Sequence, residues 1–293
     1  MRFALFNLSA NKLKGWLIKL TSTPLKGMLT GTFITALLQS STAVMVITIG
    51  LISARIMTFP QSIGIILGTN IGTTFKTELI TFNIDKVLVP LAICGALLIL
   101  LKNKKVRSIG MLLFGISSVF AAMKGFEMLA VPLTSMDYIN NFILSINDHI
   151  LLSLLTGTII TAIIQSSTAM TGIAMSFLLT GLLQLDAGIA IVLGANIGTC
   201  ITALIASIGG GKESRLAAFA HVWLNVFGVL LFIPLIPTLT ENAPLLAETK
   251  NVQLAHISVI FNVVSSIIVL PFATRFGKMI LFLHDRPPKK PLT

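Results

Sequence analysis

Residues 31–43 read GTFITALLQSSTA and residues 157–169 read GTIITAIIQSSTA, so 10 of 13 positions are identical at an offset of 126. A second pair of blocks keeps that offset: residues 65–74 read IILGTNIGTT and residues 191–200 read IVLGANIGTC, with 7 of 10 identical. The stretches between the blocks have diverged almost completely. Because two separate blocks share one register without a gap, we infer that the chain uses one structural unit twice.

The composition places this repeated unit in a membrane. Of the 293 residues, 55% are hydrophobic and 11% are charged, and the mean hydropathy is +0.95. A soluble domain carries about 25% charged residues, so this chain has too few to cover a surface that faces water. Its long apolar runs predict about eight spanning helices at ~20 residues each. We expect an all-α integral membrane protein, because lipid leaves helices as the spanning option for such runs.

The charges of the loops predict the orientation. The N-terminus and the loops 102–107, 209–215 and 284–290 are basic, whereas the loops 134–149 and 240–250 lean acidic. Since basic loops remain in the cytoplasm, we expect a multi-pass protein of the plasma membrane with both termini cytoplasmic. The net charge of +11 has the same origin, and its short clusters without interleaved aromatic residues do not indicate nucleic-acid binding.

The same charges predict that the two copies face opposite ways. The first copy follows the basic N-terminus, on the inside, and the second follows the acidic loop 134–149, on the outside. Such an inverted-topology repeat places a shared site near the bilayer midplane. We expect the first repeat, 1–107 (core 31–81), and the second, 108–293 (core 157–208), to form one transmembrane domain.

Four consecutive polar residues interrupt an apolar run in each copy, at Gln39–Thr42 and Gln165–Thr168. About a dozen helical residues reach roughly 18 Å, which is short of the ~30 Å hydrocarbon core. A break here would give two half-helices whose ends expose backbone groups inside the membrane. Exposed N–H groups attract anions, and carbonyl and hydroxyl oxygens suit sodium by analogy with other hard cations. Alternatively, the hydroxyls bond to their own backbone or join neighbouring helices.

Each second block places an asparagine, Asn70 or Asn196, between two glycines. The amide offers one acceptor and two donors, although glycines at this spacing can also serve helix packing alone. Neither motif contains Lys or Arg, so a bound anion would need backbone dipoles, hydroxyls, amides and a cation bound beside it. Moving one charge across 100 mV is worth ~2.3 kcal/mol. Uptake of a divalent anion into a negative interior therefore demands cations carried with it.

A QSST segment followed by a GxNIGT block, in two copies, resembles the type II sodium–phosphate cotransporter family of bacteria and animals, over about residues 8–274. The AH…N patterns at Ala220–Asn225 and Ala255–Asn262 belong to the resemblance. It implies re-entrant hairpins at the QSST segments, inorganic phosphate as substrate, sodium as co-substrate and no other cofactor. The binding residues it implies are Gln39, Ser40, Ser41, Thr42, Asn70, Thr73, Gln165, Ser166, Ser167, Thr168, Asn196 and Thr199. The sodium ligands are expected among Gln39, Ser40, Ser41, Thr42, Gln165, Ser166, Ser167 and Thr168.

We therefore expect sodium-coupled symport of inorganic phosphate across the lipid bilayer. Two alternatives stay open: an exporter of phosphate or another oxyanion with the same fold, and a truncated, non-transporting membrane scaffold. The scaffold is considered because the counterpart of the helix around Leu113, Phe114 and Gly115 would precede residue 1. The oligomeric state is open, with a homodimer as one option. An enzyme is not expected, since the sequence has no paired carboxylates, Ser–His–Asp arrangement or phosphate-binding Gly-Lys-Ser/Thr loop.

Other polar residues of the apolar segments have structural interpretations. Lys124 and Glu127 lie three residues apart and are expected to pair on one helix face. Lys76 and Glu78 lack counterparts in the second copy, and we favour a position at a helix end with the chain reaching to the membrane surface, the alternative being an exit path. His221 and Asn225 share one helix face, and His256 with Asn262 roughly repeats this pattern. We expect these residues to form hydrogen bonds to neighbouring helices, the alternative being a functional role.

Overall fold

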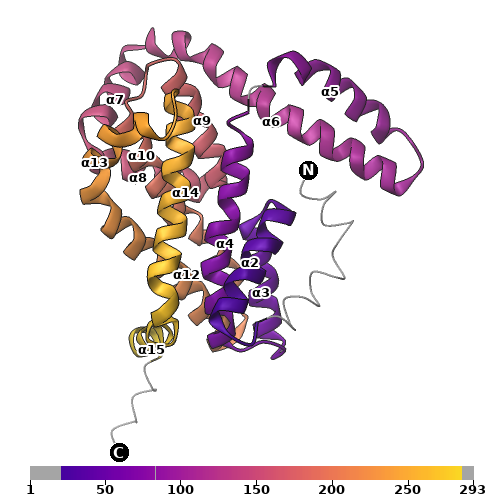
Figure 1. The fold of residues 1–293 in the computed structure, drawn as a ribbon, viewed down its shortest axis with the longest axis vertical. Helices are drawn as coiled ribbons and strands as arrows, with labels where there is room; N and C mark the ends of the chain where they lie inside the picture. The colour runs from indigo at the N-terminus through magenta and orange to yellow at the C-terminus, as the bar shows by residue number, and fades with distance from the viewer. Residues whose placement is uncertain (1–20, 83, 286–293) are drawn as a thin grey trace, which may run out of the picture.

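A computed structural model of the chain describes residues 21–82 and 84–285. Every regular element within these ranges is a helix, from α2 (Pro24–Leu38) to α15 (Ala273–His284), as Figure 1 shows. The all-α prediction is therefore confirmed. Most of the basic N-terminus and the basic residues of 286–290 lie outside the described residues.

Four helical stretches of the described chain are long and apolar enough to cross a bilayer: Lys104–Thr134, Leu185–Ala206, Gly211–Leu245 and Lys250–His284. A fifth span results if α7 (Asp137–Asp148) and α8 (Ile150–Ile164), which meet at 116°, are counted as one broken or re-entrant segment. The protein is thus a multi-pass membrane protein. The apolar runs predicted about eight spans. Polar breaks divide two of these runs, 28–54 and 150–183, into shorter helices, and the unbroken helices Phe59–Leu79 and Asp85–Ile99 of two further runs are not among the four.

Each copy of the repeat forms three principal helices. In the first copy they are α2, α3 (Ser41–Ser53) and α4 (Phe59–Leu79). In the second they are α8, α9 (Ser167–Leu179) and α10 (Leu185–Gly198), which α11 (Cys200–Ala206) continues. The first helix of each copy packs most extensively on the third, α2 on α4 and α8 on α10.

Glycines of the repeated motifs allow this close packing. A Cβ added at Gly68 would clash with the carbonyl oxygen of Met28, and one added at Gly194 would clash with that of Leu154. Gly194 lies 126 residues after Gly68, and Leu154 lies 126 residues after Met28, so the two contacts occupy equivalent positions of the repeat. Close backbone approach of this kind requires glycine. Glycine packing, one of the interpretations of the GxxxG spacing, is therefore found, and both copies pack in the same way.

Two further helices, α12 (Gly211–Phe232) and α14 (Lys250–Val269), contact both copies and run in opposite directions (Figure 1). The short α13 (Ile236–Asn242) lies in the connection between them. A hairpin of α5 (Asp85–Ile99) and α6 (Lys104–Thr134) projects from this body, and α6 returns to pack on α9. The two repeated units with α12 and α14 therefore form the core that positions the site.

Candidate functional site

Each QSST segment interrupts a helix in the same manner. Gln39 ends α2 and Gln165 ends α8, and both have a left-handed backbone with φ of 53°. The following serines, Ser40 and Ser166, begin the next half-helix. Their hydroxyls accept a hydrogen bond from the backbone N–H three residues later, at 3.1 Å in the first copy and 3.3 Å in the second. A left-handed residue ends a helix and a serine cap starts one, so the structure has the predicted break in both copies.

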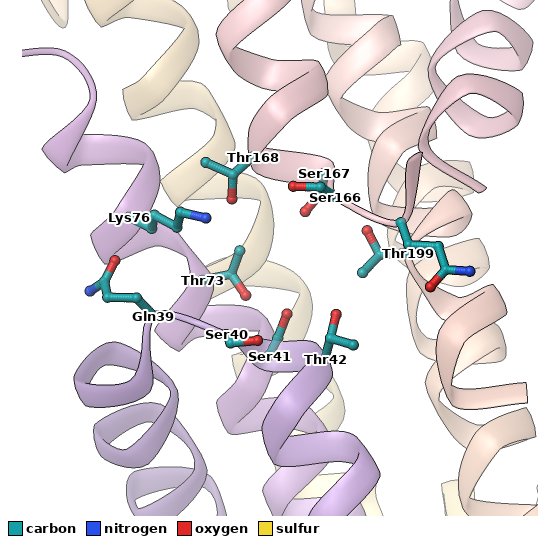
Figure 2. A pocket seen from close by; sticks show the side chains of 11 residues that line it. Gln39, Ser40, Ser41, Thr42, Thr73, Lys76, Ser166, Ser167, Thr168 and Thr199 are labelled. Atoms are coloured by element: carbon teal, nitrogen blue, oxygen red, sulfur yellow. The ribbon is translucent and has the colours of Figure 1, made fainter. Parts of the chain in front are cut away.

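The two breaks meet at one small pocket, shown in Figure 2. Its volume is about 10 Å³, which is room for roughly one water molecule. Both QSST segments, two residues of α4 and one residue after α10 form its walls. The eleven lining residues are Gln39, Ser40, Ser41, Thr42, Thr73, Lys76, Gln165, Ser166, Ser167, Thr168 and Thr199. Segments 126 residues apart in the sequence thus enclose a single polar cavity.

The hydroxyls that line the pocket differ in the hydrogen-bonding capacity that their existing bonds leave. Thr73 and Thr199 each donate to the backbone carbonyl four residues earlier, at 2.8 Å. Their oxygen lone pairs therefore remain as acceptors. Ser40 and Ser166 accept from backbone N–H groups, so their O–H groups remain as donors. The pocket combines hydroxyl oxygens suited to a cation with hydroxyl donors suited to an anion.

Two residues of the predicted set, Asn70 and Asn196, are not among the residues that line this pocket. The Asn70 side-chain N–H donates to Asn225 Oδ1 of α12 at 3.0 Å. The Asn196 side-chain N–H donates to the carbonyl of Val192 at 2.8 Å. Asn70 therefore joins two helices, and Asn196 bonds to its own helix.

Lys76 lies in the last turn of α4, the helix-end position that the sequence predicts, and it also lines the pocket. Figure 2 shows its amine directed toward Thr168 of the opposite QSST segment. Its position three residues after Thr73 on α4 was the available signal, because residues three apart share a helix face. A place on the transport path was the alternative prediction for Lys76, because Thr202 stands at the equivalent position and the repeat offers no second copy of this lysine.

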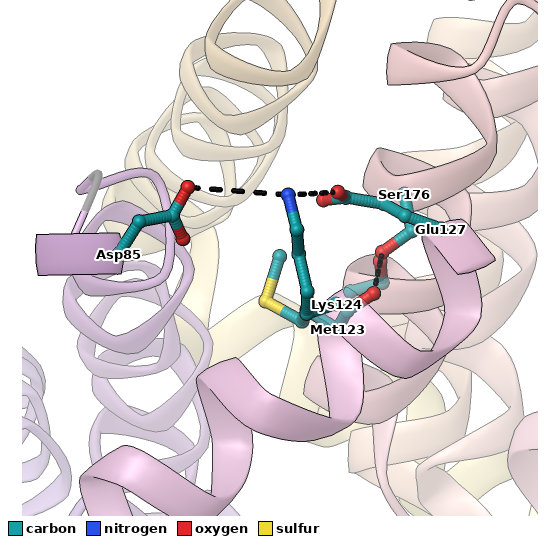
Figure 3. Close-up of polar contacts among 6 residues, drawn as sticks. Asp85, Met123, Lys124, Glu127 and Ser176 are labelled. Atoms are coloured by element: carbon teal, nitrogen blue, oxygen red, sulfur yellow. Dashed lines mark hydrogen bonds and ion pairs between the residues drawn. The ribbon is translucent and has the colours of Figure 1, made fainter. Parts of the chain in front are cut away.

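Beyond the pocket, the helix α6 carries an ion-pair cluster (Figure 3). Lys124 Nζ lies 3.0 Å from Glu127 Oε2 and 3.9 Å from Asp85 Oδ2. The predicted pairing of Lys124 with Glu127 is confirmed. At Met123, the residue before Lys124, the backbone carbonyl accepts a hydrogen bond from the Ser176 hydroxyl of α9 at 3.2 Å, which fixes α9 against α6.

Two larger cavities lie at the far ends of the second half-helices. One of about 630 Å³ adjoins the end of α3 and is lined by Ser53, Arg55 and residues 209–213. The other, of about 400 Å³, adjoins the end of α9 and includes Leu179 and the ion-pair cluster. Both half-helices thus lead from the polar pocket toward a wider opening.

The fold and the pocket define a helical, multi-pass membrane protein whose polar cavity is enclosed by two copies of one broken unit. The sequence pattern of the Na+/Pi-cotransporter family matches residues 1–128 and 130–274, and the chain belongs to this family. The family resemblance of the motifs is thereby confirmed. The family is a family of transporters. No solved structure matches it.

Three relatives illustrate the range of similar proteins. YqeW of Bacillus subtilis is 38% identical over 283 residues, which are 97% of this chain and 92% of YqeW. YjbB of Escherichia coli K12, whose name provisionally assigns it to inorganic phosphate export, is 25% identical over 262 residues, 88% of this chain and 48% of YjbB. The chain therefore spans about half of YjbB. Human sodium-dependent phosphate transport protein 2B is 33% identical over 132 residues, 43% of this chain and 19% of that protein.

Proposed function

We propose that the chain is a secondary transporter that moves inorganic phosphate together with sodium, with both held at the pocket between the QSST segments. The observation that carries the proposal is the convergence of two equivalent helix breaks on one polar cavity. Family membership supports phosphate and sodium as the cargo. Energy from a sodium gradient is needed for uptake, because the membrane potential opposes entry of the anion.

The phosphate would face the beginnings of two helices. The half-helices α3 and α9 have 13 residues each and start beside the pocket, at Ser41 and Ser167. A helix N-terminus carries unpaired N–H groups and about half a positive charge. The free O–H groups of Ser40 and Ser166 would add donors to phosphate oxygens. This arrangement explains how an anion is held by motifs that contain neither Lys nor Arg.

Sodium would face oxygen atoms of the same segments. The ends of α2 and α8 leave carbonyl groups without helical partners, and hydroxyl and carbonyl oxygens are the ligands that hard cations take. Thr73 and Thr199 add hydroxyl oxygens with lone pairs, because each of these hydroxyls donates its hydrogen to a backbone carbonyl. We retain as proposed sodium ligands the oxygens of Gln39, Ser40, Ser41, Thr42, Gln165, Ser166, Ser167 and Thr168.

We further propose that the two repeats, 1–107 and 108–293, have inverted topology in the plasma membrane. Ser53, at the end of α3, lies 2.8 Å from Ser214 near the start of α12. Leu179, at the end of α9, shares a cavity with Thr249 near the start of α14. Since α12 and α14 run in opposite directions, α3 and α9 lead to opposite ends of the body. The basic residues Arg55 and Lys212 and their cavity would then face the cytoplasm.

The size of the pocket indicates how access would alternate. A phosphate ion is larger than a water molecule, so the pocket must widen when phosphate enters. The cavities at the ends of α3 and α9 would be the cytoplasmic and external openings. Exposure of one midplane site to each opening in turn is the mechanism of inverted-repeat transporters.

Export of phosphate by the same site is the second candidate, favoured by the similarity to YjbB. Radiolabelled phosphate flux into and out of proteoliposomes, with and without a sodium gradient, separates the two. Symport predicts accumulation that requires inward sodium. Flux in either direction without sodium would favour the exporter, and no flux from folded protein would favour the scaffold.

A double variant tests the site itself. Ser40→Ala with Ser166→Ala removes both proposed O–H donors and should abolish phosphate flux. Ser118→Ala is the matched control, because the Ser118 hydroxyl bonds only to its own helix, at Phe114 O, and is exposed. Loss of a serine cap costs about 1 kcal/mol, so monodispersity in detergent must be checked first. Normal flux in the folded double variant would remove these serines from the site.

A further inference from the structure

We infer that Lys76 gives the phosphate site a resident positive charge and takes the place of one sodium ion there. The inference rests on the proposed function of the pocket. Lys76 lies on α4, lines the pocket and directs its amine toward Thr168, across from the first QSST segment (Figure 2). A lysine amine placed among hydroxyls can donate to a phosphate oxygen and neutralise part of its charge.

Lys76 is the single departure from two-fold equivalence in the pocket lining. The other ten lining residues form five pairs at the offset of 126, such as Thr73 with Thr199. The position equivalent to Lys76 is Thr202, which is not among the lining residues and whose buried hydroxyl has no hydrogen-bond partner. One side of an otherwise symmetric site therefore carries a charge that the other side lacks.

The sum of the charges shows what this lysine changes. The N-termini of α3 and α9 contribute about half a positive charge each, and the C-termini of α2 and α8, which end at the same pocket, contribute about half a negative charge each, so the four helix ends roughly cancel. With the Lys76 amine present, about one charge of a divalent phosphate stays unmatched, which one bound sodium would neutralise. A neutral residue at position 76 would leave about two negative charges unmatched, and an unmatched charge away from water is strongly unfavourable. One more bound sodium would then be needed.

The charge of Lys76 stays with the protein during transport, in contrast to that of a sodium ion. Each phosphate therefore travels with one positive charge fewer than it would through a site without the lysine. One charge moved across 100 mV changes the attainable concentration ratio about fiftyfold. Lys76 consequently shifts the balance of the carrier toward outward movement of phosphate in a cell with a negative interior.

The test compares phosphate flux at a series of sodium concentrations in proteoliposomes containing wild-type protein or Lys76→Met. We expect the half-saturating phosphate concentration at low sodium to rise roughly tenfold or more in the variant, from loss of a charged hydrogen bond. High sodium should restore binding, and the Hill coefficient for sodium should increase by about one. Lys76→Arg, which keeps the charge, should retain the wild-type sodium curve. Lys105→Met is the control and should also retain the wild-type sodium curve, because Lys105 is exposed and does not line the pocket.

A lower maximal flux with an unchanged sodium curve would overturn the inference, because a purely structural lysine would act in that way. The charge moved per phosphate, from current and tracer flux together, is the second measurement and should become more positive by about one in Lys76→Met. Lys76→Gln provides a second neutral side chain if the methionine variant does not fold. If wild-type protein shows no sodium-dependent flux, the proposed function itself fails. If wild-type protein shows such flux and Lys76→Met has the same sodium curve and the same charge moved per phosphate, this inference alone fails.

Discussion

The side-chain N–H of Asn70 donates a hydrogen bond to Oδ1 of Asn225 at 3.0 Å, and both residues are buried. This contact joins the repeated helix α4 to α12. The Asn225 amide also donates to the carbonyl of His221 at 2.9 Å and approaches Cys200 Sγ at 3.3 Å. The Asn70 amide, which lies between two glycines of the repeated motif, thus attaches α4 to α12.

Replacing one partner of this pair should destabilise the protein more than replacing both. Asn225→Leu leaves the buried Asn70 amide without its acceptor, at a cost of about 1–3 kcal/mol. The double variant Asn70→Leu, Asn225→Leu removes both polar groups and should recover part of that loss. Thermal unfolding of the four proteins in detergent forms the double-mutant cycle. Strictly additive shifts in Tm would show that the two amides do not interact.

Alanine at Gly68 or Gly194 should destabilise both copies to a similar degree. The added Cβ meets a backbone carbonyl that cannot move aside easily, and overpacking of this kind costs about 1–3 kcal/mol. Gly125→Ala in α6 is the matched control, since nothing lies within 4 Å of its added Cβ. Alanine should there leave Tm unchanged or raise it, because it favours a helix by about 0.5–1 kcal/mol over glycine. Equal shifts at all three sites would contradict the packing described.

Valine at Thr73 or Thr199 should weaken sodium activation while preserving shape. Each substitution removes a hydroxyl oxygen whose lone pairs face the pocket, and we expect the half-activating sodium concentration to rise about tenfold, as for loss of an interaction with a charged group. Thr171→Val is the control, because this hydroxyl bonds to Ser167 O at 2.9 Å but does not line the pocket. Phosphate flux measured at a series of sodium concentrations gives the half-activating concentration for each variant. The same activation curve in all three variants would exclude these threonines as sodium ligands.

Single cysteines in the connecting loop regions 102–107, which runs into the start of α6, and 134–149, which contains α7, should be labelled from opposite sides of the membrane. The exposed Cys94 is first replaced by serine, whereas Cys200 is buried and can stay. A membrane-impermeant thiol reagent applied to intact cells and to inverted vesicles makes the measurement. Labelling of both loops from one side would refute the inverted topology.

The repeated QSST motif indicated the helix breaks, and ten of the eleven residues that line the pocket are among those that the family resemblance implies. A polar segment used twice in one register has few explanations in an apolar chain, and the left-handed Gln39 and Gln165 place the breaks at the expected residues. The side to which an amide points was not available from the pattern. The sequence pattern therefore predicts Asn70 among the binding residues of the pocket, whereas the Asn70 side chain bonds to Asn225 of α12.

Lys76 shows a different limit of sequence reasoning. Comparison of the copies identifies what they share, so it gives no support to a residue present in one copy only, and an exit path stayed the alternative prediction for Lys76. In the folded chain α4 brings this lysine beside both QSST segments. The number of spanning helices was overestimated in part because hydropathy does not register where a polar break turns a long run into two short helices.

The glycine contacts have a consequence for motion. Because backbone lies directly against backbone between α2 and α4, and again between α8 and α10, neither pair can slide or separate without losing a tightly fitted interface. We therefore expect each helix pair to move as one rigid body. The small polar pocket lies between the two pairs. Any rocking of one body against the other would reshape the pocket first and leave each body's own packing intact.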